Sequence, residues 1–343
     1  MTDSSPANVG PNDANPAVPG PPIAVVSGGV GAARFLRGLL LAVEPERIVG
    51  VVNTGDDTTL HGLSISPDLD TITYTLADAI DPERGWGLVD ETWRAMGALE
   101  RYEAVRPDGS GAAPRWFNLG DQDLATHFYR TARLAEAATL TDVTDEIRRA
   151  WGVPIRLLPM SDDRCSTMVT VVEPIDGTDV VHEVTFQDYF VRLRHGVPVR
   201  SVRFDGDATL SPAADTALRD AEVVVIAPSN PLVSIGPIRS LAGVDDRLGA
   251  RRDSVVAVSP IVGGAALKGP ADRMLVELGS EATVVGVARL YAPIAATLVI
   301  DPADAHLADE VEAAGMRCVV TPSIMSSPDI ARELAQTTID AAR

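Results

Sequence analysis

Short apolar runs alternate with amphipathic stretches along most of this chain. The runs have the length of buried strands, and we predict strands at 23–26, 48–52, 155–158, 223–227, 255–259, 284–287, 298–300 and 318–321. The longer stretches between them predict helices at 32–41, 71–79, 91–102, 124–135, 141–150, 213–220, 271–278, 303–314 and 328–341. Continuous apolar strands separated by helices are typical of a mostly parallel sheet covered on both faces. The predicted fold is therefore α/β, with a doubly wound, Rossmann-like sheet.

Two segments depart from this alternation. Residues 86–150 are dominated by helical patterns, which predicts an inserted helical lobe. Residues 167–204 alternate apolar and polar positions around a turn at Asp176 and Gly177, which predicts a small antiparallel hairpin. Residues 1–22 contain six prolines among small and polar residues and are predicted to be disordered. We therefore expect one α/β domain over residues 23–343.

The overall composition argues against several classes of function. Of the 343 residues, 45% are hydrophobic, which is enough for a substantial core. The formal net charge of −19 argues against a nucleic-acid-binding surface. No apolar run has the length of a membrane span, and no signal peptide is recognisable. Cys165 and Cys318 lie in no metal-ligand spacing and are expected to be free thiols, which fits a cytoplasmic protein.

A glycine-rich turn follows the first predicted strand. Gly28, Gly29 and Gly31 lie between this strand and a predicted helix. Free N–H groups and the dipole at a helix N-terminus favour a bound anion such as phosphate. The same glycines can serve only to pack the strand closely against the helix. Taken alone, the turn does not decide between these interpretations.

Four aspartates come soon after this turn. Asp56 and Asp57 follow the second predicted strand, and Asp68 and Asp70 follow a short distance later. Successive strand ends in an open α/β sheet face the same crevice, and a crowded acidic cluster is costly unless a cation neutralises it. The four aspartates therefore suggest a divalent metal that holds a diphosphate. Helix caps or solvated turns are the simpler alternative.

Two later loops also follow predicted strands. The first offers short polar side chains between prolines, namely Ser229, Asn230 and Ser234. The second combines flexible backbone with one cation and contains Gly263, Gly264, Lys268 and Gly269. Loops of this kind at strand ends favour a nucleotide crevice, although stiff crossover loops would have the same composition.

Trp86 is the most conspicuous aromatic residue outside the predicted strands. It lies between Gly85 and Gly87, where its indole could stack on a planar ligand. A packing role in a lid explains it equally well. The chain has no Walker-type phosphate loop, nucleophile elbow or zinc-protease helix.

Taken together, these motifs resemble the 2-phospho-L-lactate transferase family, whose actinobacterial members are phosphoenolpyruvate transferases. The matching segments include SGGVGAARFL at 27–36, NTGDD at 53–57, SPDLDT at 66–71, GWG at 85–87, LGDQDLATH at 119–127, LPMSDD at 158–163, PSNPLVSIGPI at 228–238 and SPIVGG at 259–264. They occur in family order and cover nearly the whole chain after residue 22.

The resemblance implies a step in the biosynthesis of the deazaflavin coenzyme F-420. A guanosine diphosphate diester of enolpyruvate or lactate would react with 7,8-didemethyl-8-hydroxy-5-deazariboflavin, and GMP would leave. By resemblance, Mg²⁺ binds Asp56 and Asp68, catalysis uses these two residues and Asp70, and deazariboflavin lies near Asp70, Asn118 and Trp86. The nucleotide contacts would come from Gly28, Gly29, Gly31, Ser229, Asn230, Ser234, Gly263 and Gly264. A homodimer is expected.

The chain departs from the family pattern at two positions, and two other functions were weighed against the transferase. Asn118 stands where archaeal relatives carry lysine, and Gln122 replaces a common arginine. A related sugar-nucleotide-binding regulatory branch shares the glycine turn, but the 66–71 motif, the GWG motif and the helical lobe favour the transferase. An NAD-dependent oxidoreductase is disfavoured because the glycine turn lacks the full Gly-x-Gly-x-x-Gly spacing.

Overall fold

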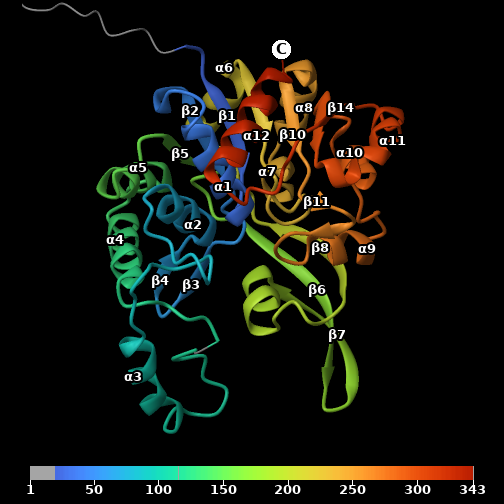
Figure 1. Cartoon of the computed structure of the whole chain (residues 1–343). Coiled ribbons are helices and arrows are strands. Elements are labelled where there is room, and N and C mark those ends of the chain that lie inside the picture. Colours follow the sequence, from blue (N-terminus) through green and yellow to red (C-terminus); the bar gives the residue numbers. More distant parts are fainter. Residues whose placement is uncertain (1–19, 115, 343) are drawn as a thin grey trace, which may run out of the picture.

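A seven-stranded parallel sheet forms the centre of the computed structural model, which describes residues 20–114 and 116–342 (Figure 1). The strand order is β14 (Arg317–Val320), β13 (Thr297–Ile300), β10 (Val255–Val258), β9 (Val223–Ile226), β1 (Ile23–Ser27), β2 (Ile48–Val52) and β5 (Arg156–Pro159). Every neighbouring pair is parallel. The predicted α/β class is confirmed.

The sheet is buried on both faces because its strands carry almost continuous apolar residues. Alternate residues of β1 divide between two cores: Ala24 and Val26 face one, and Ile23 and Val25 face the other. One core is covered by α1 (Gly29–Leu40), α2 (Pro67–Leu76), α5 (Leu140–Ala150) and α12 (Pro328–Asp340). The other is covered by α6 (Pro212–Asp220), α7 (Gly236–Ser240), α8 (Val244–Ala250), α9 (Ala271–Glu277), α10 (Val284–Tyr291) and α11 (Ala308–Ala313).

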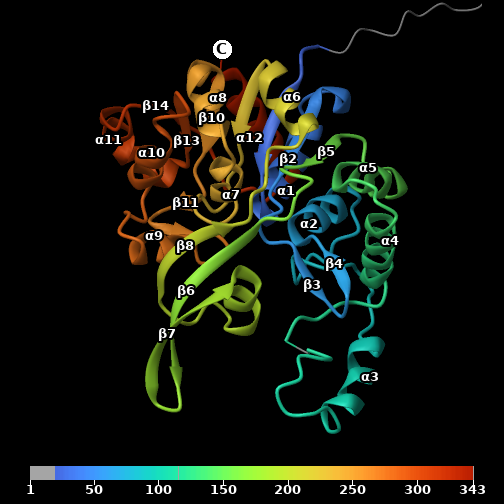
Figure 2. The ribbon, with the colours of Figure 1, turned by 180° about the vertical axis from the view of Figure 1, so that it is seen from behind.

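Further elements gather beyond the carboxyl ends of the central strands (Figures 1 and 2). They are the hairpin β3 (Thr58–Leu60) and β4 (Leu63–Ile65), the helices α3 (Arg94–Glu103) and α4 (Asp123–Ala135), the antiparallel sheet of β6 (Ser166–Ile175), β7 (Thr178–Thr185) and β8 (Val199–Asp205), and the hairpin β11 (Ile261–Val262) and β12 (Ala265–Ala266). The predicted antiparallel hairpin is therefore present as β6 and β7, with β8 added on the other side of β6.

One predicted strand is wrong. Residues 284–287 form the first turn of α10, where the Thr283 hydroxyl accepts a hydrogen bond from the backbone N–H of Gly286 at 3.1 Å. This helix is buried, so its apolar run shows no polar face and cannot be told from a strand by periodicity. The predicted helix 303–314 is a 3-10 helix (Pro302–Leu307) followed by α11.

The bounds of two helices matter for the site described below. The helices α1 and α2 begin at Gly29 and Pro67, earlier than predicted, so the glycine turn and the second aspartate pair lie in first helical turns. The predicted disorder of residues 1–22 falls mostly outside the described residues. Within residues 20–114 and 116–342, no helix is long and apolar enough to cross a membrane.

Close packing of α1 against α12 yields a stability prediction. A Cβ on Gly38 of α1 would overlap the carbonyl oxygen of Ala331 in α12. We expect Gly38→Ala to lower the free energy of unfolding by about 1–3 kcal/mol, since the two helices would have to separate. Chemical denaturation followed by circular dichroism measures this change.

Gly97→Ala is the matched control, because Gly97 lies in α3 with open space around its Cβ position. This control should raise stability by about 0.5–1 kcal/mol through helix propensity alone. Equal effects of the two substitutions would contradict the packing argument.

Candidate functional site

Asn53 joins three elements at the carboxyl edge of the sheet. It is fully buried directly after β2. Its Nδ2 donates to Asp68 Oδ2 at 2.9 Å, and its Oδ1 accepts from the backbone N–H of Gly55 at 2.9 Å. Asp68, in the first turn of α2, also accepts from the backbone N–H of Gly29 in α1. One amide and one carboxylate therefore fix the turn after β2 against the starts of α1 and α2.

Three carboxyl groups at this place are removed from water. Burial raises the pKa of Asp56 well above its ordinary value, and the nearby charge of Asp68 raises it further. Burial also raises the pKa of Asp57 to about 8 and that of Asp68 to about 6. A hydrogen bond from Asn53 to Asp68, and one from Ser66 Oγ to Asp57 Oδ2 at 2.6 Å, oppose these shifts without cancelling them. Near neutral pH this cluster binds protons, or a cation in their place.

The chemistry of the donor set fits a hard cation. At the aspartates, the buried oxygens Thr54 Oγ1, Asp56 Oδ1 and Asp57 Oδ1 have no hydrogen-bond partner in the described part of the chain. Buried polar atoms are rarely left unpaired, and Mg²⁺ takes oxygen ligands, chiefly carboxylates and water. The predicted metal ligands, Asp56 and Asp68, lie in this group, so the residues present fit the predicted ion.

Asp70 lies in a different environment. Both of its carboxylate oxygens accept from the buried guanidinium of Arg130 in α4. His127 Nδ1 lies 3.7 Å from Asp70 Oδ2, and His127 Nε2 lies 3.2 Å from Asp123 Oδ2. Tyr74 Oη donates to Asp123 Oδ1 at 2.6 Å. Asp70, Asp123 and His127 have ligand atoms within 4.8 Å of one another, a spacing that a metal ion could use. Arg130 already supplies the positive charge that neutralises Asp70.

Four of the predicted nucleotide-binding residues meet between β1 and β9. Ser229 Oγ donates to the carbonyl oxygen of Gly28 at 2.7 Å. A Cβ on Gly28 would lie 2.8 Å from Ser234 Cβ, and a Cβ on Gly31 would overlap the carbonyl oxygen of Pro228. The loop after β9 therefore approaches the start of α1 so closely that only glycine fits there. Close packing accounts for Gly31 without a ligand.

The other predicted nucleotide-binding residues have identifiable backbone roles. Gly29 has φ +68° at the start of α1. Asn230 Oδ1 accepts from the backbone N–H of Leu232 at 2.9 Å and so closes the turn after β9. Gly263 and Gly264 form the two-residue turn between β11 and β12, with φ of +60° and +80°, which favours glycine. Nucleotide binding by these four residues stays a prediction.

The predicted deazariboflavin residue Trp86 belongs to an aromatic and cationic stack. The Arg84 guanidinium lies 5.5 Å from the Trp86 ring and 5.2 Å from the Trp93 ring. The two indole rings are 5.9 Å apart, and Trp86 is 43% exposed. Asn118 is exposed shortly before α4. Arg84 thus holds Trp86 in place while part of the indole stays accessible to a planar molecule.

Glu91 was missed by sequence reasoning, although it orients this segment. Its carboxylate accepts from the backbone N–H of Leu88 at 2.9 Å and from that of Asp123 at 2.7 Å. A Cβ on Gly120 would overlap this carboxylate, which explains the glycine of the GDQD segment. Gly120 was the signal available in the sequence, because a glycine often stands where a neighbouring group leaves no room for a Cβ. Glu91 therefore ties residues 81–93, the Trp86 loop, to the start of α4.

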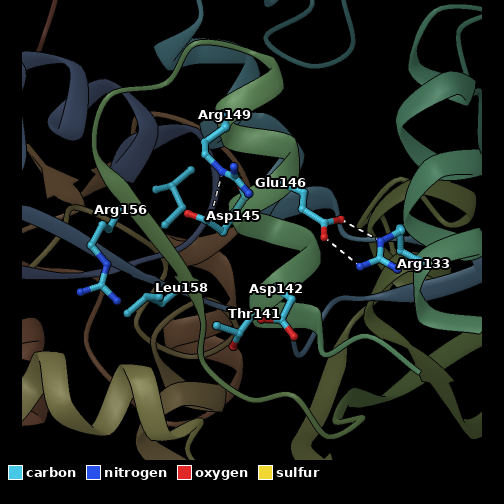
Figure 3. Close-up of a pocket in the computed structure, with 9 residues that line it drawn as sticks. Arg133, Thr141, Asp142, Asp145, Glu146, Arg149, Arg156 and Leu158 are labelled. Atoms are coloured by element: carbon cyan, nitrogen blue, oxygen red, sulfur yellow. Dashed lines mark hydrogen bonds and ion pairs between the residues drawn. The ribbon is translucent and has the colours of Figure 1, made fainter. Parts of the chain in front are cut away.

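A separate pocket of about 320 Å³ lies against α5 and the edge strand β5 (Figure 3). It is lined by Arg133, Thr141, Asp142, Asp145, Glu146, Arg149, Arg156, Leu157 and Leu158, none of which is a predicted site residue. Four of its charged residues form two ion pairs, Arg133 with Glu146 at 2.9 Å and Arg149 with Asp145 at 2.9 Å. The aspartate cluster remains the stronger candidate site, because its charges are buried without such pairing.

Comparison with known proteins decides the family. The model of the family described as 2-phospho-L-lactate transferase CofD matches residues 23–324. The chain belongs to this family. The phosphoenolpyruvate transferase of Kitasatospora aureofaciens is 42% identical over 321 residues, covering 92% of this chain and 96% of that protein. The phosphoenolpyruvate transferase of Mycobacterium tuberculosis H37Rv is 39% identical over 336 residues, which cover 93% of this chain and 98% of that protein.

These matches confirm that this 2-phospho-L-lactate transferase family member is a transferase of coenzyme F-420 biosynthesis. The crystal structure of the protein BH3568 from Bacillus halodurans is similar in fold, with a TM-score of 0.57 and 15% identity. The matched region covers 93% of this chain and 99% of the BH3568 chain. At this identity the likeness concerns the fold alone.

The two environments of the aspartates predict opposite effects on stability in this transferase. Asp70→Asn leaves the buried Arg130 charge without its partner, so we expect a loss of about 3–5 kcal/mol in the free energy of unfolding. Asp56→Asn replaces a buried carboxyl group whose ionised form is repelled by Asp68, so stability without metal should stay the same or rise. Denaturation in the presence of a chelator measures both. Similar destabilisation by the two variants would contradict this assignment.

The raised carboxyl pKa values also predict a pH dependence. When the pKa of a carboxyl group is higher in the folded than in the unfolded protein, the folded protein binds the proton more tightly. The free energy of unfolding therefore falls as the pH rises from the unfolded pKa to the folded pKa. For Asp57 this interval runs from about pH 4, the ordinary carboxyl pKa, to about pH 8. In a chelator, the stability of Asp57→Asn relative to wild type should therefore increase over this interval.

Magnesium should weaken the same pH dependence, since it binds the ionised folded form and stabilises it by mass action. Thermal denaturation of both proteins at pH 5 and pH 8, with and without Mg²⁺, makes the comparison. A constant difference between the two proteins in chelator would show that Asp57 does not titrate in this interval.

Proposed function

We propose that this transferase moves an enolpyruvyl-phosphate or 2-phospholactyl group from its guanosine diphosphate diester to the terminal ribityl hydroxyl of 7,8-didemethyl-8-hydroxy-5-deazariboflavin. GMP is the second product. The observation that carries the proposal is the buried aspartate cluster at the carboxyl edge of β1 and β2, in a chain of the 2-phospho-L-lactate transferase family. The names of its phosphoenolpyruvate transferase relatives support the enolpyruvyl form.

The residues of the cluster suit a phosphoryl transfer, which depends mainly on positioning and on charge neutralisation. Asp56 and Asp68 would hold Mg²⁺, which neutralises charge on the diphosphate and on the departing GMP. The ribityl oxygen forms a bond to the phosphorus that carries the three-carbon acid. The bond from that phosphorus to the GMP oxygen breaks, and GMP keeps the electron pair. The hydroxyl proton passes to an unpartnered carboxylate oxygen of the cluster.

The acceptor would lie on the side of the site formed by α2, α4 and the Trp86 loop. Glu91 fixes this loop through Leu88, and Arg84 holds the Trp86 indole at the surface. The deazaflavin ring could stack there while its ribityl chain extends toward the aspartates. A loop closed over the ring would also exclude water, the competing nucleophile. From the family resemblance we further propose a homodimer, which sedimentation analysis tests.

The activity is tested with purified protein, Mg²⁺, deazariboflavin and freshly prepared enolpyruvyl or lactyl guanosine diphosphate. We expect GMP together with a phosphodiester-linked deazaflavin of unchanged absorbance, because the ring takes no part in the chemistry. Mass spectrometry of each product identifies the preferred three-carbon group. Asp56→Asn should lower turnover by about 10²–10⁴-fold, since it removes several kcal/mol of charge stabilisation. Asp108→Asn, in an exposed loop, is the matched control.

Two outcomes would reject the proposal. The first is rapid hydrolysis of the donor without deazariboflavin and no diester when it is added, which would indicate a hydrolase. The second is thermal stabilisation by UDP-N-acetylglucosamine but not by GDP or deazariboflavin, which would favour the sugar-nucleotide-binding alternative.

A further inference from the structure

Lys268 is the only lysine of the chain. The other 28 of the 29 basic residues counted as Lys or Arg are arginines. It is exposed in the segment between β12 and α9. Within the described part of the chain, no carboxylate lies within ion-pair distance of its ammonium, whereas many arginines have such partners. The side chain therefore carries a positive charge that the described residues do not neutralise.

The position of this charge is defined by Gly85. A Cβ on Gly85 would lie 2.6 Å from Lys268 Nζ, so the ammonium rests directly against the backbone of the Trp86 loop. Gly85 is buried and has φ +75°, which a side chain would strain as well as obstruct. The closeness of these two residues places the end of the exposed Lys268 side chain against the backbone of the Trp86 loop.

This contact spans the carboxyl edge of the sheet. Lys268 follows β10 and the β11–β12 hairpin, whereas Gly85 follows β2 and α2. In the sheet, β9 and β1 lie between β10 and β2. The ammonium therefore reaches from one half of the fold to the other, on the same edge as the aspartate cluster. Figures 1 and 2 both show β11 and α9 at this end of the sheet.

The chemistry of the proposed donor calls for a cation besides the metal. The donor carries negative charge on two phosphates and on the carboxylate of its three-carbon acid, and the aspartates nearby repel it. A divalent ion held by those aspartates neutralises only part of this charge. An ammonium is a compact point charge that fits beside a glycine, whereas a guanidinium is planar and needs more room.

We propose that Lys268 binds an oxyanion of the guanosine diphosphate diester, either its diphosphate or the carboxylate of its three-carbon acid. This inference rests on the proposed function. In the free protein the ammonium rests against Gly85, and in the complex it donates to the donor from the side opposite the aspartates. Donor binding would thereby hold the β12–α9 segment and the Trp86 loop together.

Binding measurements without turnover test the inference. Calorimetry with Mg²⁺ and no deazariboflavin should show that Lys268→Met weakens binding of the enolpyruvyl guanosine diphosphate diester by about 10- to 100-fold, the range for a lost charge-assisted hydrogen bond. Lys268→Arg keeps the charge and should regain part of this loss. Arg332→Met, on the exposed face of α12, is the matched control and should bind like wild type.

The comparison with GDP identifies the oxyanion. If Lys268 binds the diphosphate, Lys268→Met should weaken GDP binding by a similar factor. If it binds the carboxylate of the three-carbon acid, GDP binding should stay unchanged while diester binding falls. In both cases the melting temperature should stay close to that of wild type, whereas loss of a merely structural contact would lower it.

Because the chain has a single ε-amine, chemical modification gives an independent readout. Acetylation of Lys268, followed by peptide mass spectrometry, should be slowed by the diester and by neither buffer nor Mg²⁺ alone. The inference is overturned if Lys268→Met binds the diester within about twofold of wild type, or if the diester leaves the acetylation rate unchanged. These results are separate from the proposed function, which fails if wild type binds the diester but forms no product with deazariboflavin.

Discussion

The hydrogen bond between Asn53 and Asp68 is the constraint on which the site depends. It places a carboxylate at the start of α2 against the turn after β2, and the same carboxylate meets the first amide of α1. The elements that carry the glycine turn and the aspartates are thus fixed to one another by a buried polar contact in addition to the apolar core that they share. The charges around this contact are only partly compensated: Arg130 and Ser66 lower the pKa of Asp57 without cancelling the effect of burial, and Asp56 Oδ1 has no hydrogen-bond partner among the described residues.

The arrangement divides the acidic residues between two tasks. Asp70 is compensated by Arg130 inside the protein, so it contributes to the packing of α2 against α4. Asp56 lacks a cation of its own, so its charge is available to one that arrives with a substrate. Two carboxylates two positions apart on one helix, Asp68 and Asp70, therefore face different partners. This division explains how a strongly acidic centre can coexist with a stable core.

Every strand of the central sheet was predicted from sequence, because each is a short apolar run bounded by polar residues or glycine. The segment 284–287 was predicted wrongly because a buried helix can be equally apolar. In the site, Asp56 and Asp68 could be brought together by the rule that strand ends share an edge. Arg130 could not be paired with Asp70, since the two are 60 positions apart and no pattern links them. Glu91 was not recognised either, although the need for glycine at position 120 marks the place of its carboxylate.

The parallel sheet also governs how the chain can fold. Ile23 pairs with Val223, 200 positions later, and α1 packs against α12 near the end of the chain. While the ribosome is still making the middle of the protein, β1 therefore has no neighbour on its β9 side. Long-range pairings of this kind slow folding and leave strand edges open to other chains. Nascent copies of this protein should consequently depend on chaperone protection until β9 and β10 have been synthesised.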